Sequence, residues 1–291
     1  MTEDGPVPRV SPYVHRLAAF TGDPDGGNPA GVVVTEEPLT DADMQRIAAE
    51  VGYSETAFLS SPSGDRRRWQ VRYFAPRAEV SFCGHATVAS GVLLGAQVGA
   101  GRFTFDTTVG VVDVQVAVDG AQVLATLSSV APTVEWLEAS RLAPFLPALG
   151  YRADRLDPTY PPAIASAGAR HLILVLRRRA DLAALDYLFD ELHAAMHAEQ
   201  LTTVALLWPD PDGRWHARNP FPTGGVVEDP ATGAAAAAFG AYLRELGHLD
   251  PPAWFEIVQG EDLGRPSRLH VHVPAGTGGI DVAGTAVPMP G

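Results

Sequence analysis

The chain has 291 residues, of which 46% are hydrophobic, and its 34 acidic and 21 basic residues give it a formal net charge of −13. Because nucleic-acid binding depends on a basic surface, this charge argues against nucleic acid as a partner. The single cysteine excludes an internal disulfide framework and a zinc site built on cysteines, and no apolar segment reaches membrane-spanning length. We therefore expect a globular cytoplasmic protein with no membrane partner.

The length predicts two domains, each large enough for a core of its own. We place them at residues 1–130 and 131–291, with the last strand available to pair with the first domain. Residues 1–10 carry two acids and two prolines ahead of any apolar run, so no signal peptide is expected there.

The first half is predicted to consist mainly of strands. Thr40 is the expected N-cap of a helix that ends near Gly52, with Asp43 completing an approximate capping box. The dipeptide Asp119-Gly120 predicts a hairpin. β-branched and aromatic residues with partial alternation predict strands at residues 14–20, 30–35, 56–59, 69–74, 102–106, 109–118 and 122–127.

Two segments far apart in the chain have the same construction. In residues 74–87 a polar residue stands in a turn just before residues 88–95, which are mostly small and apolar. Residues 221–233 have the same relation to the apolar residues 234–243. Such a helix, with hardly a charge on it, is predicted to be buried on all sides. Its first N–H groups still need partners. Two such N-termini facing each other across a cleft would attract an anion the size of a carboxylate.

The second half is predicted to repeat this scheme after a Pro- and Ala-rich crossover at residues 132–162, which contains a short helix around 136–146. An amphipathic helix is expected at 182–199 and a buried one at 233–246. Strands are expected at 171–176, 202–208, 214–217, 254–259, 268–273 and 280–287. This order indicates an α+β fold, without regular βαβ alternation and without a Gly-rich nucleotide fingerprint.

Glu55, His85 and Asp229 are the candidate acid–base groups. Burial of Glu55 at the start of an apolar strand would raise its pKa toward the range of a general base, although an exposed glutamate is also common there. His85, in a helix-start turn, either exchanges protons near neutral pH or merely packs. Asp229 stands just outside a helix start, where it is either functional or a plain cap or Asx-turn.

Cys83 offers a second chemistry. A thiol ahead of a helix N-terminus can have its pKa lowered and then serve as a base or nucleophile. Racemisation with two thiols would need a second cysteine at the equivalent place, which Asp229-Pro230 occupies. We favour the interpretation that Cys83 is a small buried residue.

Several short motifs stand along the chain in a fixed order. They are Gly27-Asn28-Pro29-Ala30-Gly31-Val32-Val33 after Phe20, Ser54-Glu55-Thr56-Ala57-Phe58, Cys83-Gly84-His85-Ala86-Thr87, Glu228-Asp229-Pro230-Ala231-Thr232-Gly233, Gln259-Gly260 and Gly264-Arg265-Pro266-Ser267. In order and spacing they resemble the PhzF family of phenazine biosynthesis, from about residue 12 to the C-terminus.

The resemblance implies a diaminopimelate epimerase-like fold, in which two pseudo-symmetric halves each wrap a β-barrel-like sheet around a central buried helix. It also implies a site between the halves, a homodimer, and neither cofactor nor metal. The best understood member of the family is an isomerase that moves a double bond by proton transfer.

Residue by residue, the resemblance makes Glu55 the general base that takes a proton from carbon and returns it elsewhere. His85 and Asp229 match the flanking polar pair that orients the substrate and can shuttle protons. Cys83 aligns with one cysteine of the epimerases, whose partner is missing here.

The resemblance also implies a substrate-binding set at the two helix starts. Backbone N–H groups at Gly84 and Gly233 match positions that bind a substrate carboxylate, in turns that include Thr232 and Ala234. The position after Gly233 is commonly serine in the family, so Ala234 removes a hydroxyl and indicates a different substrate.

We therefore predict a cofactor-independent isomerase that acts on a small carboxylate-bearing metabolite of a biosynthetic pathway. One alternative is an epimerase or racemase using Cys83 with Glu55 or His85. Another, from a different class, is a scaffold that binds a metabolite or a protein without turnover.

Overall fold

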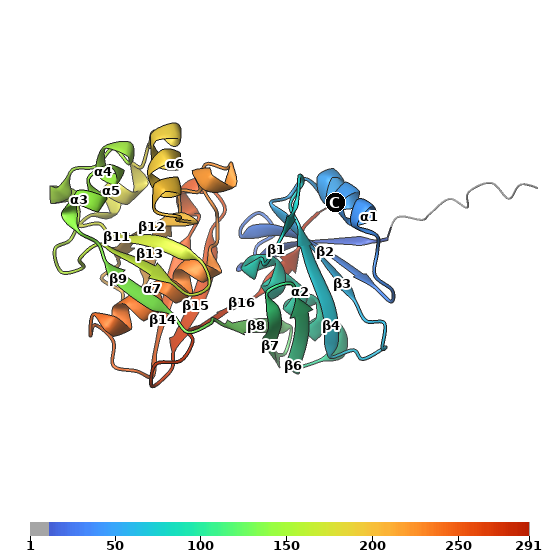
Figure 1. The fold of residues 1–291 in the computed structure, drawn as a ribbon. Helices are drawn as coiled ribbons and strands as arrows, with labels where there is room; N and C mark the ends of the chain where they lie inside the picture. The colour runs from blue at the N-terminus through green and yellow to red at the C-terminus, as the bar shows by residue number, and fades with distance from the viewer. Residues whose placement is uncertain (1–11, 291) are drawn as a thin grey trace, which may run out of the picture.

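Two halves lie side by side in the computed structural model, which describes residues 12–290, and each half surrounds one central helix (Figure 1). The central helices are α2 (Gly84–Val98) and α7 (Gly233–Glu245). Both are rich in alanine and glycine, and both are buried along most of their length, as the sequence predicts. Residues 1–10, where no signal peptide is expected, lie outside the described part.

The first half places α2 inside a curved sheet and α1 (Asp41–Val51) on its outer face. Thr40 caps α1 by accepting a hydrogen bond from the backbone N–H of Asp43, and Gly52 ends the helix in the left-handed conformation. Both helix ends are as predicted. The strands of this half are β1 (Val14–Ala19), β2 (Asn28–Thr35), β3 (Glu55–Ser60), β4 (Arg68–Phe74), β5 (Glu79–Val80), β6 (Gly101–Thr107), β7 (Gly110–Asp119) and β8 (Gln122–Ser128).

The second half surrounds α7 and carries a second apolar layer on its outer side. In β11 (Arg170–Val175), Ile173 and Val175 belong to the core around α7, whereas Leu172 and Leu174 pack with the outer helices. The outer layer contains α3 (Ala139–Leu142), α4 (Phe145–Ala148), α5 (Arg179–Ala183) and α6 (Phe189–Ala198). The other strands are β9 (Thr133–Trp136), β10 (Ala163–Ser166), β12 (Thr203–Pro209), β13 (Trp215–Arg218), β14 (Ala253–Gln259), β15 (Ser267–Val273), β16 (Asp281–Gly284) and β17 (Ala286–Pro288). Single 3-10 turns are η1 (Ala153–Arg155), η2 (Pro222–Gly224) and η3 (Glu261–Leu263).

The last two strands join the halves into one hydrogen-bonded sheet of 17 strands. β16 pairs with β15 on one side and with β8 on the other, and β17 pairs antiparallel with β1. The single strand predicted at 280–287 is wrong, because the pairing divides at Thr285, whose carbonyl accepts a hydrogen bond from the backbone N–H of Phe20. The boundary at residue 130 stays a prediction.

Two segments predicted as single helices are each divided into two helices in the structure. The segment 136–146 begins as the end of β9, which pairs with β10, and continues as α3 and α4, with Pro144 between them. The predicted helix 182–199 is interrupted after α5 ends at Ala183. The backbone N–H of Leu188 donates to the carbonyl of Ala148, so a tertiary hydrogen bond replaces a helical one before α6 begins.

In residues 12–290, the helices are all too short or too polar to cross a membrane.

Candidate functional site

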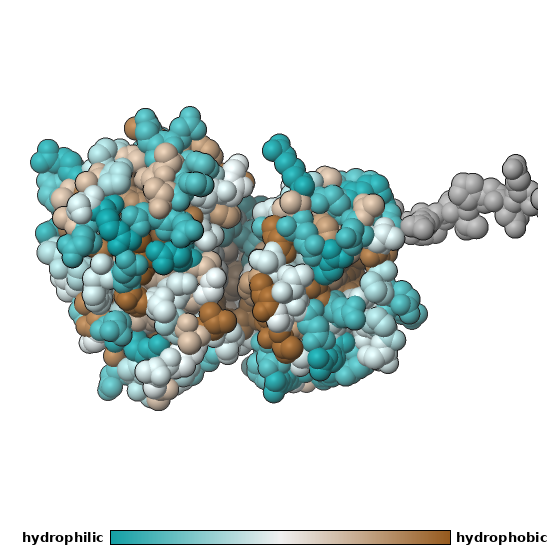
Figure 2. All heavy atoms as spheres, in the orientation of Figure 1, coloured by the Kyte–Doolittle hydropathy of each residue, from teal (hydrophilic) through white to brown (hydrophobic). Residues whose placement is uncertain are grey.

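The predicted site residues gather where the N-termini of α2 and α7 approach each other across the two halves. The two helices contact each other, and a groove separates the halves on the face shown in Figure 2. Gly84 and Gly233, the first residues of these helices, are only partly buried, while the helix interiors behind them are closed to solvent. Solvent therefore reaches the helix starts.

The backbone N–H groups at both starts have no acceptor within their own helix. In α2 the first N–H with a backbone acceptor at the helix start is that of Thr87, which donates to the carbonyl of Cys83. In α7 it is that of Ala236, which donates to the carbonyl of Thr232. Helix geometry leaves the N–H groups before these donors without a helical acceptor. Among them, that of Ala86 donates to the sulfur of Cys83, whereas no hydrogen bond to another backbone group within residues 12–290 engages those of Gly84, Gly233 and Ala234, three of the predicted substrate-binding residues.

Glu55 and His85 lie together on the first half. Glu55 starts β3, and its Oε2 lies 3.5 Å from His85 Nε2 in the first turn of α2. The hydroxyl of Ser54 lies 3.4 Å from the same ring nitrogen. The side chain of Glu55 is 19% exposed and that of His85 only 7%, so the carboxylate is the more accessible group. The pair can exchange a proton between a carboxylate and an imidazole.

Cys83 lies beneath this pair, with its Sγ 3.3 Å from His85 Nδ1. Burial, followed by the negative charge of Glu55, raises the pKa of the Cys83 thiol. The alternative in which the helix N-terminus lowers this pKa is therefore wrong, because desolvation outweighs the helix dipole here. The favoured interpretation, a small buried cysteine, is confirmed. The thiol remains protonated at neutral pH.

Asp229 approaches from the second half, and both its carboxylate oxygens accept a hydrogen bond. The side-chain amide of Asn28 donates to Oδ1 over 2.6 Å, and the hydroxyl of Thr232 donates to Oδ2 over 2.6 Å. Desolvation by burial is the main cause that raises the pKa of Asp229, and the negative charge of Glu55 raises it further. The charge of His85 and the hydrogen bond from Thr232 lower this pKa, but they do not cancel the rise. Asp229 thus responds to the charges of the first half.

Gln259 fixes the direction of the hydrogen bonds around Asp229. Its Oε1 accepts from the backbone N–H of Thr232, which can only donate, so its Nε2 must face the other way. That nitrogen donates to the carbonyl of Asp229 over 2.6 Å and to the hydroxyl of Thr232 over 3.1 Å. The hydroxyl hydrogen of Thr232 is therefore left for the Asp229 carboxylate.

Asn28 and Gln259 have no role in the sequence interpretation, although both stand in the quoted motifs. Each is a polar side chain only 2% exposed at the end of a strand. A buried amide needs a partner for its donors, and this is the signal that could have found them.

Glu55, Cys83 and His85 also have ligand-type atoms that all lie within 4.8 Å of one another. The three side chains fall short of the four ligands of a structural zinc site. We assign no metal to them.

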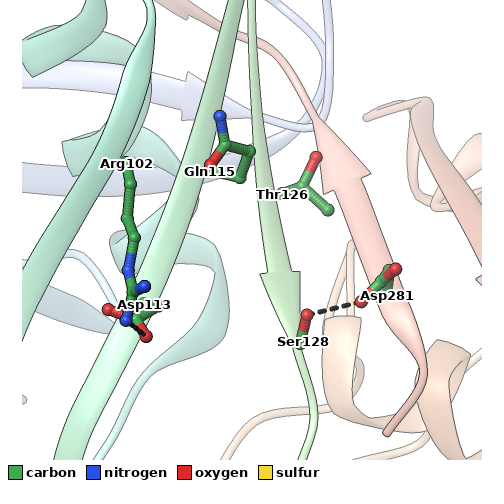
Figure 3. Close-up of a pocket in the computed structure, with 6 residues that line it drawn as sticks. All are labelled: Arg102, Asp113, Gln115, Thr126, Ser128 and Asp281. Carbon is green, nitrogen blue, oxygen red and sulfur yellow. Dashed lines mark hydrogen bonds and ion pairs between the residues drawn. The ribbon is translucent and has the colours of Figure 1, made fainter.

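A separate polar hollow of about 350 Å³ lies on the outer face of β7, β8 and β16 (Figure 3). In it Arg102 is paired with Asp113, and Ser128 donates a hydrogen bond to Asp281. Its charged groups thus already have partners, since Asp281 also pairs with His272. The hollow contains none of the acid–base residues described above. We do not assign it a function.

Comparisons with known proteins identify the family and the fold of the chain. Residues 17–290 match the family model described as "Phenazine biosynthesis-like protein". The chain is 33% identical over 258 residues, 87% of each chain, to the trans-2,3-dihydro-3-hydroxyanthranilate isomerase of Pseudomonas aeruginosa. It is 31% identical to YfhB of Bacillus subtilis, an uncharacterized isomerase, over 94% of this chain and 95% of that one.

A crystal structure of a Bacillus anthracis phenazine biosynthesis protein of the PhzF family superposes on the chain with a TM-score of 0.86. The two are 26% identical, and the superposition covers 95% of this chain and 96% of the other. The predicted fold class is thereby confirmed.

Proposed function

Because this chain belongs to the PhzF family of phenazine biosynthesis-like isomerases, we propose that it moves a proton and a double bond in a small carboxylate-bearing biosynthetic metabolite, without a cofactor. The observation that carries the proposal is the meeting of Glu55, His85 and Asp229 beside two helix starts that leave N–H groups without a helical acceptor. This combination supplies both an acid–base group and an anion-binding group.

Glu55 is the proposed base. Its carboxylate takes a proton from a C–H bond next to a double bond, and the electron pair of that bond forms a new double bond as the old one shifts. Protonation of the far carbon by the carboxylic acid of Glu55 then completes the isomerisation, so no atom is gained or lost. A positioned base of this kind contributes roughly 10² to 10⁴ in rate.

His85 and Asp229 are the proposed auxiliary groups. His85 Nε2, 3.5 Å from Glu55, can take or return the proton while the substrate rearranges. Asp229 has a raised pKa, which makes it a better proton carrier at neutral pH than an exposed aspartate.

The helix starts are the proposed carboxylate site. Free N–H groups and the positive end of the helix dipole favour an anion there. The Pseudomonas aeruginosa relative acts on an anthranilate derivative, a compound with such a carboxylate. Ala234 offers no hydroxyl at the second residue of α7, so we infer a substrate that needs no hydrogen bond at that point.

The two alternatives have less support. Epimerisation through Cys83 needs a thiolate, and burial disfavours one. A scaffold without turnover has no need of a carboxylate and an imidazole 3.5 Å apart beside an anion site.

Solvent deuterium incorporation tests the proposal. The protein would be incubated in D₂O with trans-2,3-dihydro-3-hydroxyanthranilate and other small unsaturated carboxylates, and the products examined by NMR and mass spectrometry. Deuterium at a new carbon with a shifted double bond supports the isomerase. Deuterium with loss of configuration would indicate the epimerase, and tight binding without exchange would indicate the scaffold.

The homodimer and the cytoplasmic location stay predictions. Light scattering after size-exclusion chromatography would give about twice the chain mass of 30.8 kDa for a dimer. Fractionation of the native host cells would test the location.

A further inference from the structure

Arg265 forms a side-chain bridge from the second half of the molecule to the first. Its Nε donates a hydrogen bond to the carbonyl of Gly27 over 2.8 Å, and its Nη2 donates to the carbonyl of Gly26. Arg265 lies between η3 and β15, whereas the two glycines lie between β1 and β2. We call these two hydrogen bonds the Arg265 latch.

The segment held by the latch is closely packed against its neighbours. Gly27 has a φ of +65°, and a Cβ there would lie 2.4 Å from the carbonyl oxygen of Ala19. The backbone N–H of Gly27 also donates to the carbonyl of Pro266 over 3.1 Å. Only glycine fits this conformation, so the carbonyls that accept from Arg265 belong to a closely packed turn.

The residue that follows the latched glycines is Asn28. Its buried amide donates to Asp229 Oδ1 over 2.6 Å and to the carbonyl of Ala231 over 3.1 Å. A displacement of the latched backbone would therefore move the amide that holds one oxygen of the Asp229 carboxylate.

The backbone of Arg265 is tied to the other support of Asp229. The backbone N–H of Arg265 donates to the carbonyl of Gly260 over 3.0 Å, and a Cβ on Gly260 would lie only 2.4 Å from the Arg265 carbonyl oxygen. Gln259, the preceding residue, donates to the carbonyl of Asp229 over 2.6 Å. Residues 259–265 of the second half thus support Asp229 directly through Gln259. Through Arg265, the same residues also hold the backbone before Asn28, the first-half residue that donates to Asp229.

We propose that Arg265 is a positioning residue that acts through Asn28: by holding the carbonyls of Gly26 and Gly27, it places the Asn28 amide on the Asp229 carboxylate. Its relevance to catalysis rests on the proposed function, in which Asp229 belongs to the acid–base group. The side-chain hydrogen bonds of Arg265 go to backbone carbonyls of the loop, so its effect on the site is indirect.

Arginine suits this role better than lysine does. The planar guanidinium presents two donors in a fixed direction, and here they reach two successive carbonyls. An ammonium group can reach one of them but does not fix its orientation. R265K should therefore keep part of the effect, and R265A should lose it.

NMR of the asparagine side chains tests the proposal without a substrate. The chain contains two asparagines, Asn28 and Asn219, so protein labelled with ¹⁵N-asparagine gives two side-chain amide signals, which an N28A variant assigns. Asn219, which donates to Thr203 Oγ1 within the second half, is the internal control. The matched control variant is R268A, because Arg268 is exposed and pairs with Glu256 on the neighbouring strand.

In R265A the Asn28 amide signal should move, and its hydrogen exchange should accelerate about five- to tenfold, the range expected for loss of roughly one hydrogen bond. R265K should give an intermediate effect, while R268A and the Asn219 signal should not change. An unchanged Asn28 signal in R265A would overturn the proposal, and so would equal changes at Asn28 and Asn219. If R265A does not fold, the same comparison on R265K decides.

Once a substrate is known, kinetics add a second test. R265A should lower kcat more than it raises KM, and the N28A/R265A double variant should lose no more kcat than N28A alone. Additive losses would show that Arg265 acts by another route. Because the NMR comparison does not need turnover, failure of the proposed isomerase would leave it valid.

Discussion

Asn28 and Asp229 stand 201 residues apart in the chain, yet the amide nitrogen of the first lies 2.6 Å from a carboxylate oxygen of the second. The contact joins the start of β2 in the first half to the turn before α7 in the second. The acid–base group therefore depends on how the two halves are placed, and the following predictions test its members one by one.

Replacing Glu55 by glutamine should remove the base while keeping its shape. We expect kcat to fall by roughly 10² to 10⁴, with substrate affinity largely retained. Steady-state kinetics and calorimetry would measure the two effects. E50Q is the control, because Glu50 is 62% exposed and pairs with Arg46 on the surface of α1. A Glu55→Gln enzyme that turns over substrate near the wild-type rate would show that the base lies elsewhere.

Cys83 should be dispensable for the reaction. The buried thiol has no cysteine partner, so C83A should fold, lose about 1 kcal/mol of stability and keep most of its activity. Urea unfolding and kinetics would check both expectations. An inactive but folded C83A protein, or rapid alkylation of the wild type that substrate prevents, would favour the epimerase instead.

The raised pKa of Asp229 predicts a pH-dependent gap in stability between wild type and D229N. A group whose pKa is higher in the folded state binds protons more tightly there, so the wild type loses stability as pH rises from the ordinary value of 3.8 through the folded pKa. The neutral amide introduced by D229N avoids this loss, and the hydroxyl of Thr232 can rotate to accept its amide hydrogen. Glu55 and His85, whose charges act on Asp229, are common to both proteins.

The stability of D229N relative to wild type should therefore increase as pH rises from 3.8 through the folded pKa of Asp229, and this gain should disappear as pH falls back toward 3.8. Denaturant unfolding of both proteins at several pH values measures it. A gap that does not change with pH would show that Asp229 titrates alike in the folded and unfolded chain.

The anion site predicts where a small carboxylate binds. Crystals soaked with a carboxylate or sulfate should show it within hydrogen-bond distance of the backbone at Gly84 or Gly233, held by helix N–H groups. For a shared substrate, the two helix starts must lie within about 15 Å of each other in the closed protein, given the size of small-molecule clefts. An ion bound only elsewhere, or a larger separation, would argue against the proposed mechanism.

Local sequence signals correctly predicted those features of the fold that depend on interactions between residues close together in the chain, such as helix ends. Thr40 and Gly52 mark the ends of α1, and the charge-free stretch after Gly84 marks a buried helix, because capping and burial leave direct traces in residue type. The break before Leu188 left no such trace, since it depends on a hydrogen bond to Ala148, 40 residues earlier.

For the candidate site, too, residues with a local sequence signal were predicted and residues defined by long-range contacts were not. Glu55, His85 and Asp229 were identified from their local setting and from the family resemblance. The amides of Asn28 and Gln259 were not, because their partners lie on other segments of the chain and no spacing within one motif encodes such a contact.

The pairing of β16 with β8 and of β17 with β1 also has a consequence for synthesis in the cell. While the chain is still being translated, the first half has all the residues of α2 and of the strands β1 to β8, but β1 and β8 each keep an unpaired edge. Such edges readily pair with other chains. β16 and β17 are translated long after β1 and β8, so these two edges stay open to other chains until the later strands have been made.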